Sequence, residues 1–234
     1  MKAVILAGGL GARLKPFTEV IPKPLLPIGE KSLLEVQISR LKKHGFDEIY
    51  LATNYKSDYI QSFFADGSRL GVKLTVNKEK KPLGTCGPIR LLSDKLDQPF
   101  LVINGDILTT MDFSKLYDFA LRIDSDFVVA TKEIITPFEF GNVNSEGDYL
   151  TSIEEKPDLK LEIIAGIYVL KPSVIDLIPE DEYFGMDMLI KKMFKAKLPV
   201  AKYLISEYWL DIGNINDYKI AHEAYLDHFK DQTS

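Results

Sequence analysis

The first 131 residues alternate between short apolar runs and longer helical stripes, and this alternation constrains the fold more than any other feature. Strand-like runs are predicted at residues 2–7, 48–53, 72–76, 100–103 and 126–131. Helical patterns separate them, at residues 33–43, 57–65, 89–96 and 113–123. Strands that alternate with helices form right-handed βαβ units on a parallel sheet. The sequence therefore predicts an α/β fold with a mainly parallel central sheet flanked by helices.

The pattern changes after residue 136. Strand-like segments at residues 140–144, 148–154 and 163–170 follow one another, separated by Gly, Asp and Pro. This predicts a smaller antiparallel portion in the second half, before a helix at residues 184–194 and a strand at residues 200–205. There is no repeat, low-complexity tract or linker, so we expect one domain over residues 1–234 with halves at 1–135 and 136–234.

Composition and charge exclude several classes of partner. A net charge of −5 argues against a general nucleic-acid surface. No apolar run approaches the roughly 20 residues needed to span a bilayer, so no membrane partner is expected. The single cysteine, Cys86, excludes an internal disulfide and suits a reducing, cytoplasmic location. No pattern decides between a monomer and a homo-oligomer.

The first apolar run leads into a glycine-rich turn followed by Arg13. The turn consists of Leu6, Ala7, Gly8, Gly9, Leu10 and Gly11. It lacks the third glycine of a dinucleotide fingerprint and the G-K-[ST] of a P-loop. Two interpretations remain. Either this is a plain tight turn, or its backbone amides face an anion and Arg13 contacts two phosphate oxygens.

Lys23 lies ten residues beyond Arg13, between Pro22 and Pro24. Two prolines restrict the backbone, so the lysine is held on a stiff segment. A solvent-facing loop lysine is one interpretation, and its spacing from Arg13 favours phosphate binding as the other.

Two aspartates follow apolar runs at points where ligands collect in α/β sheets. Asp106 comes directly after residues 100–103 and Asn104-Gly105, and Asp211 lies in Trp209-Leu210-Asp211-Ile212-Gly213. Carboxylate oxygens are ligands that Mg²⁺ prefers. The pair is therefore predicted to share one metal site or to hold two ions, although Asp106 also suits a simple Asx turn.

Glu155 and Lys156 precede Pro157 at the end of a predicted strand. As a solvated charged turn they need no function. Functionally, the lysine would meet a phosphate while a carboxylate accepts sugar hydroxyls. The three histidines are too scattered for a metal site, so no catalytic histidine is predicted.

Taken together, these segments resemble the sugar-1-phosphate nucleotidylyltransferases. The matching segments occur in the family's order between residues 3 and 213, and comprise the glycine-rich turn with Arg13, Pro22-Lys23-Pro24-Leu25, Pro82-Leu83-Gly84-Thr85, Gly105-Asp106, Glu155-Lys156-Pro157, Gly166-Ile167-Tyr168 and Trp209 to Gly213. No single segment is specific, but the combination is.

The resemblance implies a Rossmann-like catalytic domain that converts an NTP and a sugar 1-phosphate to an NDP-sugar and pyrophosphate. It implies that the turn from Leu6 to Gly11 holds base and phosphates, and that Arg13 and Lys23 bind the triphosphate. Asp106 and Asp211 would hold Mg²⁺. It further implies that Gly84 and Thr85 line the base pocket in the first half, and that Gly141, Glu155 and Lys156 meet the sugar phosphate in the second.

The segments around residues 82–88 and 184–190 look most like the guanylyl members that use mannose-type or heptose 1-phosphates. Glu79 is placed where a carboxylate would accept from guanine N1 and N2, so GTP is favoured over UTP and CTP. Two departures concern the sugar: Ile164 stands where many hexose-using members have asparagine, and Asn214 replaces a usual threonine. The alternative from another class is a non-catalytic regulatory subunit, which would be expected to lack one of the four charged site residues.

Overall fold

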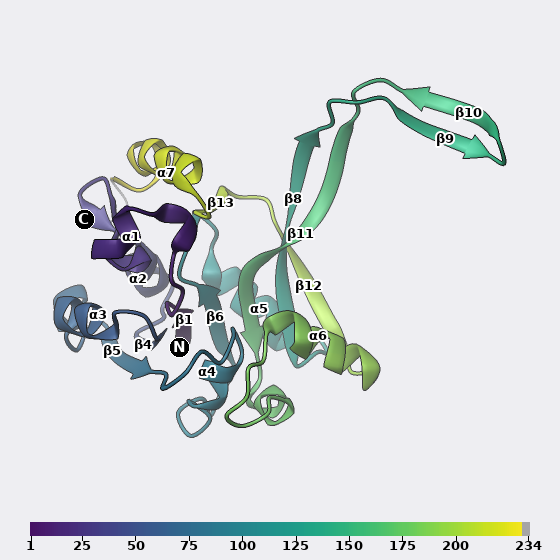
Figure 1. Cartoon of the computed structure of the whole chain (residues 1–234). Helices are drawn as coiled ribbons and strands as arrows, with labels where there is room; N and C mark the ends of the chain where they lie inside the picture. Colours follow the sequence, from purple (N-terminus) through teal and green to yellow (C-terminus); the bar gives the residue numbers. More distant parts are fainter. Residues whose placement is uncertain (231–234) are drawn as a thin grey trace.

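The computed structural model describes residues 1–230 (Figure 1). Its α-helices are α1 (Phe17–Val20), α2 (Leu33–Lys43), α3 (Ser57–Phe64), α4 (Gly87–Arg90), α5 (Phe113–Arg122), α6 (Met186–Lys195) and α7 (Ile215–His228). Its 3-10 helices are η1 (Ala12–Leu14), η2 (Lys23–Leu25), η3 (Ser68–Leu70) and η4 (Pro172–Leu177).

Most of the strands belong to one large sheet. The seven strands of that sheet are β1 (Lys2–Leu6), β4 (Glu48–Thr53), β5 (Lys73–Lys78), β6 (Phe100–Asn104), β8 (Phe127–Pro137), β11 (Asp158–Leu170) and β12 (Val200–Ile205). The remaining strands form small antiparallel pairs, β2 (Pro27–Ile28) with β3 (Lys31–Ser32), β7 (Ile107–Thr109) with β13 (Trp209–Asp211), and β9 (Asn142–Glu146) with β10 (Tyr149–Glu154).

The central sheet is mixed and mainly parallel, in the order β12-β8-β11-β6-β1-β4-β5. β1 pairs in parallel with both β4 and β6, and β4 with β5. β11 is antiparallel to β6 and β8, while β12 returns parallel to β8. The predicted α/β class is confirmed, and strands from both halves of the chain join in this one sheet.

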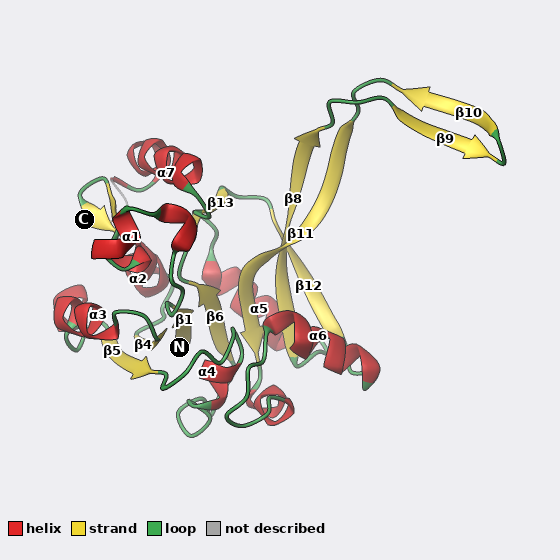
Figure 2. Cartoon of the chain, in the orientation of Figure 1, coloured by secondary structure: helices red, strands yellow, loops and turns green. Residues whose placement is uncertain are grey.

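Helices cover both faces of the sheet (Figure 2). In β1, Ala3 and Ile5 face the core built with α2, α3 and α5, whereas Val4 faces the core built with α4 and α6. Side chains of a strand alternate between faces, so a strand buried on both sides is a continuous apolar run. This is why the short apolar runs identified the sheet.

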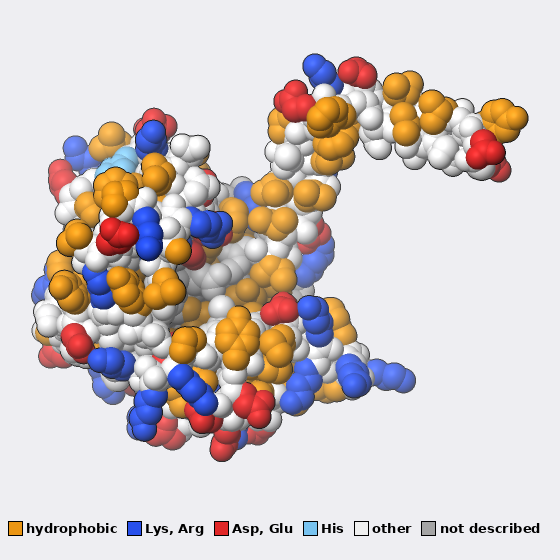
Figure 3. Space-filling view, in the orientation of Figure 1, with side chains coloured by type: hydrophobic (Ala, Val, Ile, Leu, Met, Phe, Trp, Pro, Cys, Tyr) orange, Lys and Arg blue, Asp and Glu red, His pale blue; other side chains and the backbone are white. Residues whose placement is uncertain are grey.

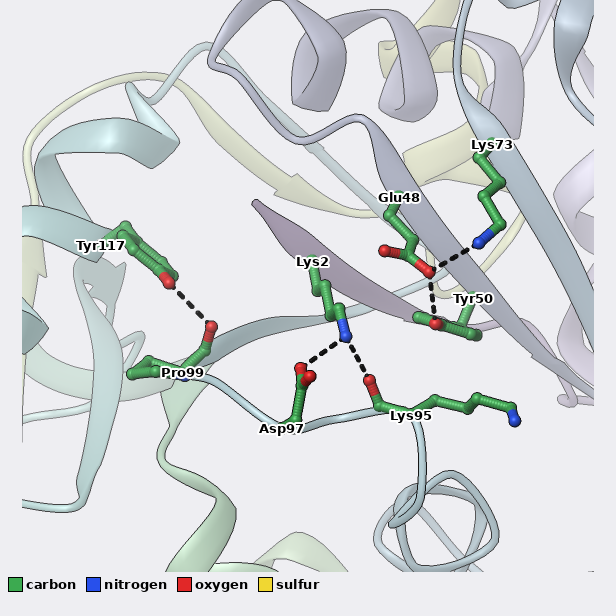
Figure 4. Close-up of polar contacts among 8 residues, drawn as sticks. All are labelled: Lys2, Glu48, Tyr50, Lys73, Lys95, Asp97, Pro99 and Tyr117. Carbon is green, nitrogen blue, oxygen red and sulfur yellow. Dashed lines mark hydrogen bonds and ion pairs between the residues drawn. The ribbon is translucent and has the colours of Figure 1, made fainter.

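Polar contacts fasten the sheet near the amino ends of its strands (Figure 4). Lys2 Nζ lies 2.6 Å from Asp97 Oδ1 and also donates to the carbonyl of Lys95. Tyr117 donates to the carbonyl of Pro99 at 2.8 Å. The glycine-rich turn and Asp106 lie at the opposite, carboxyl end, where open α/β sheets bind ligands.

Two predicted elements differ from the structure. The helix expected over residues 89–96 is α4, which begins at Gly87 and ends at Arg90. Beyond it the amides of Leu92, Ser93 and Lys95 donate to carbonyls three residues back, so the segment continues as turns. The strands expected at residues 126–131 and 163–170 are β8 and β11, which run much further.

The extensions of β8 and β11, together with β9 and β10, stand away from the sheet as an arm (Figure 1). We call residues 132–164 the arm. The strands expected at residues 140–144 and 148–154 are β9 and β10, which pair antiparallel within this arm. The outer parts of β8 and β11 were not predicted, because these residues do not pack in the core and their runs are interrupted by polar residues. None of the helices between residues 1 and 230 is long and apolar enough to cross a membrane.

Candidate active site

Two adjoining cavities open at the carboxyl end of the parallel strands. The first, of about 260 Å³, is lined by the glycine-rich turn and two cations, with the full lining Leu6, Ala7, Gly9, Gly11, Ala12, Arg13, Lys23, Pro24, Gly105, Asp106 and Gly213. The second, of about 420 Å³, shares Leu6, Gly9 and Asp106 with it. It extends toward Gly8, Glu79, Gly84 and Thr85, so residues predicted from three separate segments meet in one cleft.

Arg13 is positioned by glycines on two sides. Gly11, at the start of η1, has a φ of 62°, a left-handed conformation that glycine adopts without strain. On the other side, a Cβ added to Gly213 would lie 3.3 Å from Arg13 Nη1. The guanidinium therefore lies close against the backbone of the Trp209–Gly213 segment. The two motifs, some 200 residues apart in sequence, form a single wall.

Lys23 and Asp106 form a close ion pair in the first cavity. Lys23 begins η2, and its Nζ donates to Asp106 Oδ2 at 2.7 Å. Their side chains are only 11% and 27% exposed, so the pair is screened much less than a surface pair. Burial keeps Lys23 inside the cleft, which excludes the interpretation as a solvent-facing loop lysine.

Asp211 lies next to Asp106 through strand pairing. β13 runs antiparallel to β7 with Asp211 opposite Ile107, and the Ile212 amide donates to the Asp106 carbonyl at 3.0 Å. Asp211 lines neither cavity, but desolvation and the charge of Asp106 raise its pKa, whereas Lys23 and Arg13 lower it. The like charge of Asp106 contributes to this rise, so a cation bound between the two carboxylates would offset it.

This pair fits a magnesium ion that binds together with a phosphate ligand. Within residues 1–230 no cluster of three or more His, Cys, Asp or Glu side chains forms a complete metal cage. Mg²⁺ is commonly held by one or two carboxylates plus substrate phosphates and waters. Asp106 and Asp211 would supply the carboxylates, and the neighbouring cavity leaves room for phosphates.

The second cavity contains a buried carboxylate. Glu79 is 7% exposed, and its Oε2 accepts from the Leu83 amide at 3.0 Å. Desolvation raises the pKa of Glu79, and that one hydrogen bond only partly lowers it. Among the described residues no hydrogen-bond donor reaches Oε1, so this oxygen is available to a ligand with N–H groups.

The glycine-containing turn at residues 82–87, part of which lines the second cavity, is held by hydrogen bonds to residues 184–186 at the start of α6. The Phe184 amide donates to the Leu83 carbonyl, and the Cys86 amide donates to the Phe184 carbonyl, both at 2.9 Å. Thr85 Oγ1 accepts from the Met186 amide at 2.7 Å. These three bonds give the floor of the second cavity one conformation, with Cys86 packed behind it as a buried thiol.

A buried glutamine holds the turn that carries Asp106. Gln37, from α2, donates through Nε2 to the carbonyls of Asn104 at 3.0 Å and Ile107 at 2.7 Å. These carbonyls flank Gly105-Asp106, so one side chain ties both ends of the turn. Sequence reasoning placed Gln37 only within a helical pattern, because nothing in that pattern distinguishes a positioning glutamine from a surface one.

The structure does not bring the residues predicted for the sugar phosphate into the cleft. Gly141, Glu155 and Lys156 lie on the arm, are exposed and line neither cavity. Gly141 and Glu155 do lie together, because a Cβ on Gly141 would be 3.1 Å from Glu155 Oε2.

Three lining residues of the second cavity were not predicted. Asn54 and Asn104 stand at the carboxyl ends of β4 and β6, where the reasoning applied to Asp106 would have found them. Tyr183 lies in a loop with no pattern that marks it.

Comparison with known proteins decides the family. The family model described as nucleotidyl transferase matches residues 2–228, nearly the whole of the described chain. The chain belongs to this family. The resemblance drawn from the motifs is thereby confirmed.

Two curated relatives with names of guanylyltransferases are similar to this chain. The rice (Oryza sativa subsp. japonica) protein "Probable mannose-1-phosphate guanylyltransferase 1" is 36% identical over 242 residues, which cover 97% of this chain. This chain spans only 65% of the rice protein's length. The Campylobacter jejuni D-glycero-alpha-D-manno-heptose 1-phosphate guanylyltransferase is 36% identical over 220 residues, covering 93% of this chain and 97% of that protein.

Solved structures show the same architecture. HddC from Yersinia pseudotuberculosis, in a complex with GMP-PN, superposes with a TM-score of 0.74 at 30% sequence identity. The match covers 96% of this chain and 99% of HddC.

Proposed function

We propose that this nucleotidyl transferase uses GTP and a sugar 1-phosphate to form a GDP-sugar and pyrophosphate. The observation that carries the proposal is that Arg13, Lys23 and Asp106 line one cavity, with Asp211 beside Asp106, and that this cavity adjoins a second cavity with a buried carboxylate. Cations and metal ligands in the first suit a triphosphate, and the second suits a base.

The chemistry needs charge compensation more than acid–base groups. The attacking phosphate oxygen of the sugar is already an anion, so no general base is required. Two unit charges 4 Å apart repel by about 4 kcal/mol at an effective dielectric near 20, and several such pairs add when two phosphates approach. Arg13 and Lys23 bind and orient the triphosphate and offset this repulsion, and positioning supplies much of the remaining rate.

Asp106 and Asp211 are the residues that would hold Mg²⁺. When bound, the ion supplies further charge neutralisation and orientation at the phosphates. In the structure Lys23 pairs with Asp106 at 2.7 Å, so its ammonium holds this carboxylate until phosphate oxygens compete for the lysine. The reaction is then an in-line displacement with inversion at the α-phosphorus, in which the bond to the sugar phosphate forms and pyrophosphate leaves.

Glu79 is proposed to recognise the guanine base. Glu79 is buried in the lining of the second cavity, with its Oε1 beside Gly8 of the same lining, and a carboxylate accepts well from the N1 and N2 donors that guanine presents together. Uracil presents a single N–H donor and cytosine one amino group, so neither matches this arrangement as fully. The names of the curated relatives and the GMP-PN complex of HddC support the same base.

The residues proposed to bind the sugar 1-phosphate lie on the arm. Glu155 and Lys156 are proposed to meet the sugar phosphate with Gly141, and this requires the arm to approach a cleft that it does not line in the structure. Mannose-type or heptose 1-phosphates are the favoured substrates, and the fine specificity is proposed to depend on Ile164 near the base of the arm.

The test is an activity panel. The protein is incubated with each of GTP, UTP, CTP and ATP, with Mg²⁺ and with mannose, glucose or heptose 1-phosphates, and pyrophosphate release is followed. We expect release with GTP and a manno-configured sugar 1-phosphate. Turnover with UTP but not GTP would refute the assignment of Glu79, and silence across the panel would favour a non-catalytic binding protein.

A further inference from the structure

The arm exposes an unusual amount of apolar surface. Ten large apolar side chains on it are exposed, namely Ile135, Phe138, Phe140, Val143, Tyr149, Leu150, Ile153, Leu159, Leu161 and Ile164. Tyr149 alone is 80% exposed. Strand register places Val143 opposite Ile153, and Leu161 opposite the half-buried Ile134. Contiguous exposed apolar surface of this kind marks an interaction site.

The arm is also strongly acidic. Residues 132–164 contain eight acidic and three basic residues, a net charge of −5 that equals the net charge of the whole chain. The rest of the protein is therefore neutral overall. A partner surface that covers the arm should be apolar and basic, because complementary potentials favour one partner over others.

A surface with these properties lies on the protein itself, at the end of α6. Phe194 is 62% exposed and Leu198 is 41% exposed, and the exposed Lys195 and Lys197 stand between them. We call these four residues the α6 patch. Figure 3 shows Lys and Arg side chains gathered at the lower right, where α6 lies in Figure 1, across an open gap from the arm.

Within one chain the arm and the α6 patch lie apart, but the arm of one chain is complementary in charge to the α6 patch of another. Figure 1 shows the arm and α6 projecting on the same side of the sheet. If the arm of each copy lies on the α6 patch of the other, both contacts form at once around a two-fold axis. A stable interface buries about 800 Å² on each partner, which a long arm and an apolar patch in duplicate can supply.

We propose that this chain forms a homodimer in which the acidic, apolar arm of each copy covers the α6 patch of the other. The pairing follows from surface chemistry and does not depend on the proposed reaction. In the dimer the exposed apolar side chains of the arm leave water, and the acidic side chains of the arm face Lys195 and Lys197.

The first test is the mass of the full chain in solution. Size-exclusion chromatography with light scattering at micromolar concentration should give twice the chain mass. The double variant Phe140→Ser/Tyr149→Ser, which changes only exposed side chains, should be a monomer of unchanged circular dichroism. A wild-type protein that stays monomeric would overturn the proposal, as would a dimer unaffected by this change.

The second test identifies which surfaces meet. An arm variant, Glu146→Lys/Asp148→Lys, and a patch variant, Lys195→Glu/Lys197→Glu, place like charges opposite each other in every contact. Each alone should dimerise at least tenfold more weakly than wild type. Mixed together they should form a heterodimer with wild-type affinity, because both of its contacts again join opposite charges.

The control reverses two exposed lysines elsewhere, Lys115→Glu/Lys219→Glu, and should leave the dimer unchanged. Two charge variants that remain monomers when mixed would show that the arm and the α6 patch do not meet. Variants that each dimerise as tightly as wild type would show the same.

Discussion

Replacing Gln37 tests whether a side chain outside the cleft positions the metal-binding turn. Gln37→Leu keeps the volume but removes the donors to the carbonyls of Asn104 and Ile107. A buried polar group left without a partner costs about 1–3 kcal/mol, and two are created here. The change also removes Gln37 Oε1, a buried acceptor that has no partner among the described residues, and this recovers part of the loss. We expect a net destabilisation of about 2 kcal/mol.

For a chain of this size about 2 kcal/mol lowers Tm by roughly 4–8 °C. The functional effect should exceed the effect on folding, because the freed turn carries Asp106. Loss of the groups that support a metal ligand typically weakens metal binding by about 10–100-fold. We expect the Mg²⁺ concentration for half-maximal pyrophosphate release to rise about tenfold, with KM for the sugar phosphate much less affected.

A matched control separates positioning from general destabilisation. Ser125 is a buried hydroxyl that hydrogen-bonds to the carbonyls of Phe127 and Pro199, at the opposite end of the sheet. Ser125→Ala should lower Tm comparably and leave the Mg²⁺ dependence unchanged. If Gln37→Leu lowers Tm but leaves the Mg²⁺ dependence at the wild-type value, the positioning role is refuted.

Further predictions concern the cleft itself. Asp106→Asn should abolish Mg²⁺-dependent turnover while circular dichroism stays unchanged. The raised pKa of Asp211 means that the folded state disfavours its ionised carboxylate, so Asp211→Asn should raise Tm at neutral pH without Mg²⁺. The same change should remove the increase in Tm that Mg²⁺ gives to the wild type. If Mg²⁺ still increases the Tm of the variant by the same amount, the ion binds elsewhere. Burial raises the pKa of Glu79, so this carboxylate takes up a proton at a higher pH than an exposed glutamate does. As the pH is lowered, KM for GTP should therefore rise earlier than it would with an exposed glutamate. The KM of Glu79→Gln should not change over the same pH range. Gly213→Ala should displace the Arg13 guanidinium and lower kcat/KM by up to about 10²-fold with little change in Tm.

The parallel half of the fold was predictable because its buried strands have a recognisable sequence pattern. Strands covered on both faces must be apolar throughout, so residues 100–103 and 126–131 are recognisable without any tertiary information. Helix α2 was equally clear from its apolar stripe, and in the structure Ser32 and Glu35 form a capping box at its start. Where burial ended, as in the outer parts of β8 and β11, the signal weakened and the strand ends were missed.

The cleft was predictable to the extent that its residues follow strands. Asp106 and the glycine-rich turn were placed correctly because carboxyl ends of parallel strands meet at one edge. The ion pair between Lys23 and Asp106 was not predicted, because the conformation of η2 decides where the lysine points. The position of Glu155 and Lys156 on a projecting arm was also not predicted, because the sequence of a turn does not show how far its flanking strands extend from the sheet.

The fate of the three phosphates of GTP tests the central claim most directly. GTP labelled with ³²P in the α-phosphate, or separately in the γ-phosphate, is incubated with the protein, Mg²⁺ and mannose 1-phosphate, and the products are separated. The account predicts that the α label enters a nucleotide sugar and the γ label enters pyrophosphate, in equal amounts and only when the sugar phosphate is present. Release of the γ label as inorganic phosphate, or consumption of GTP without the sugar phosphate, would contradict it.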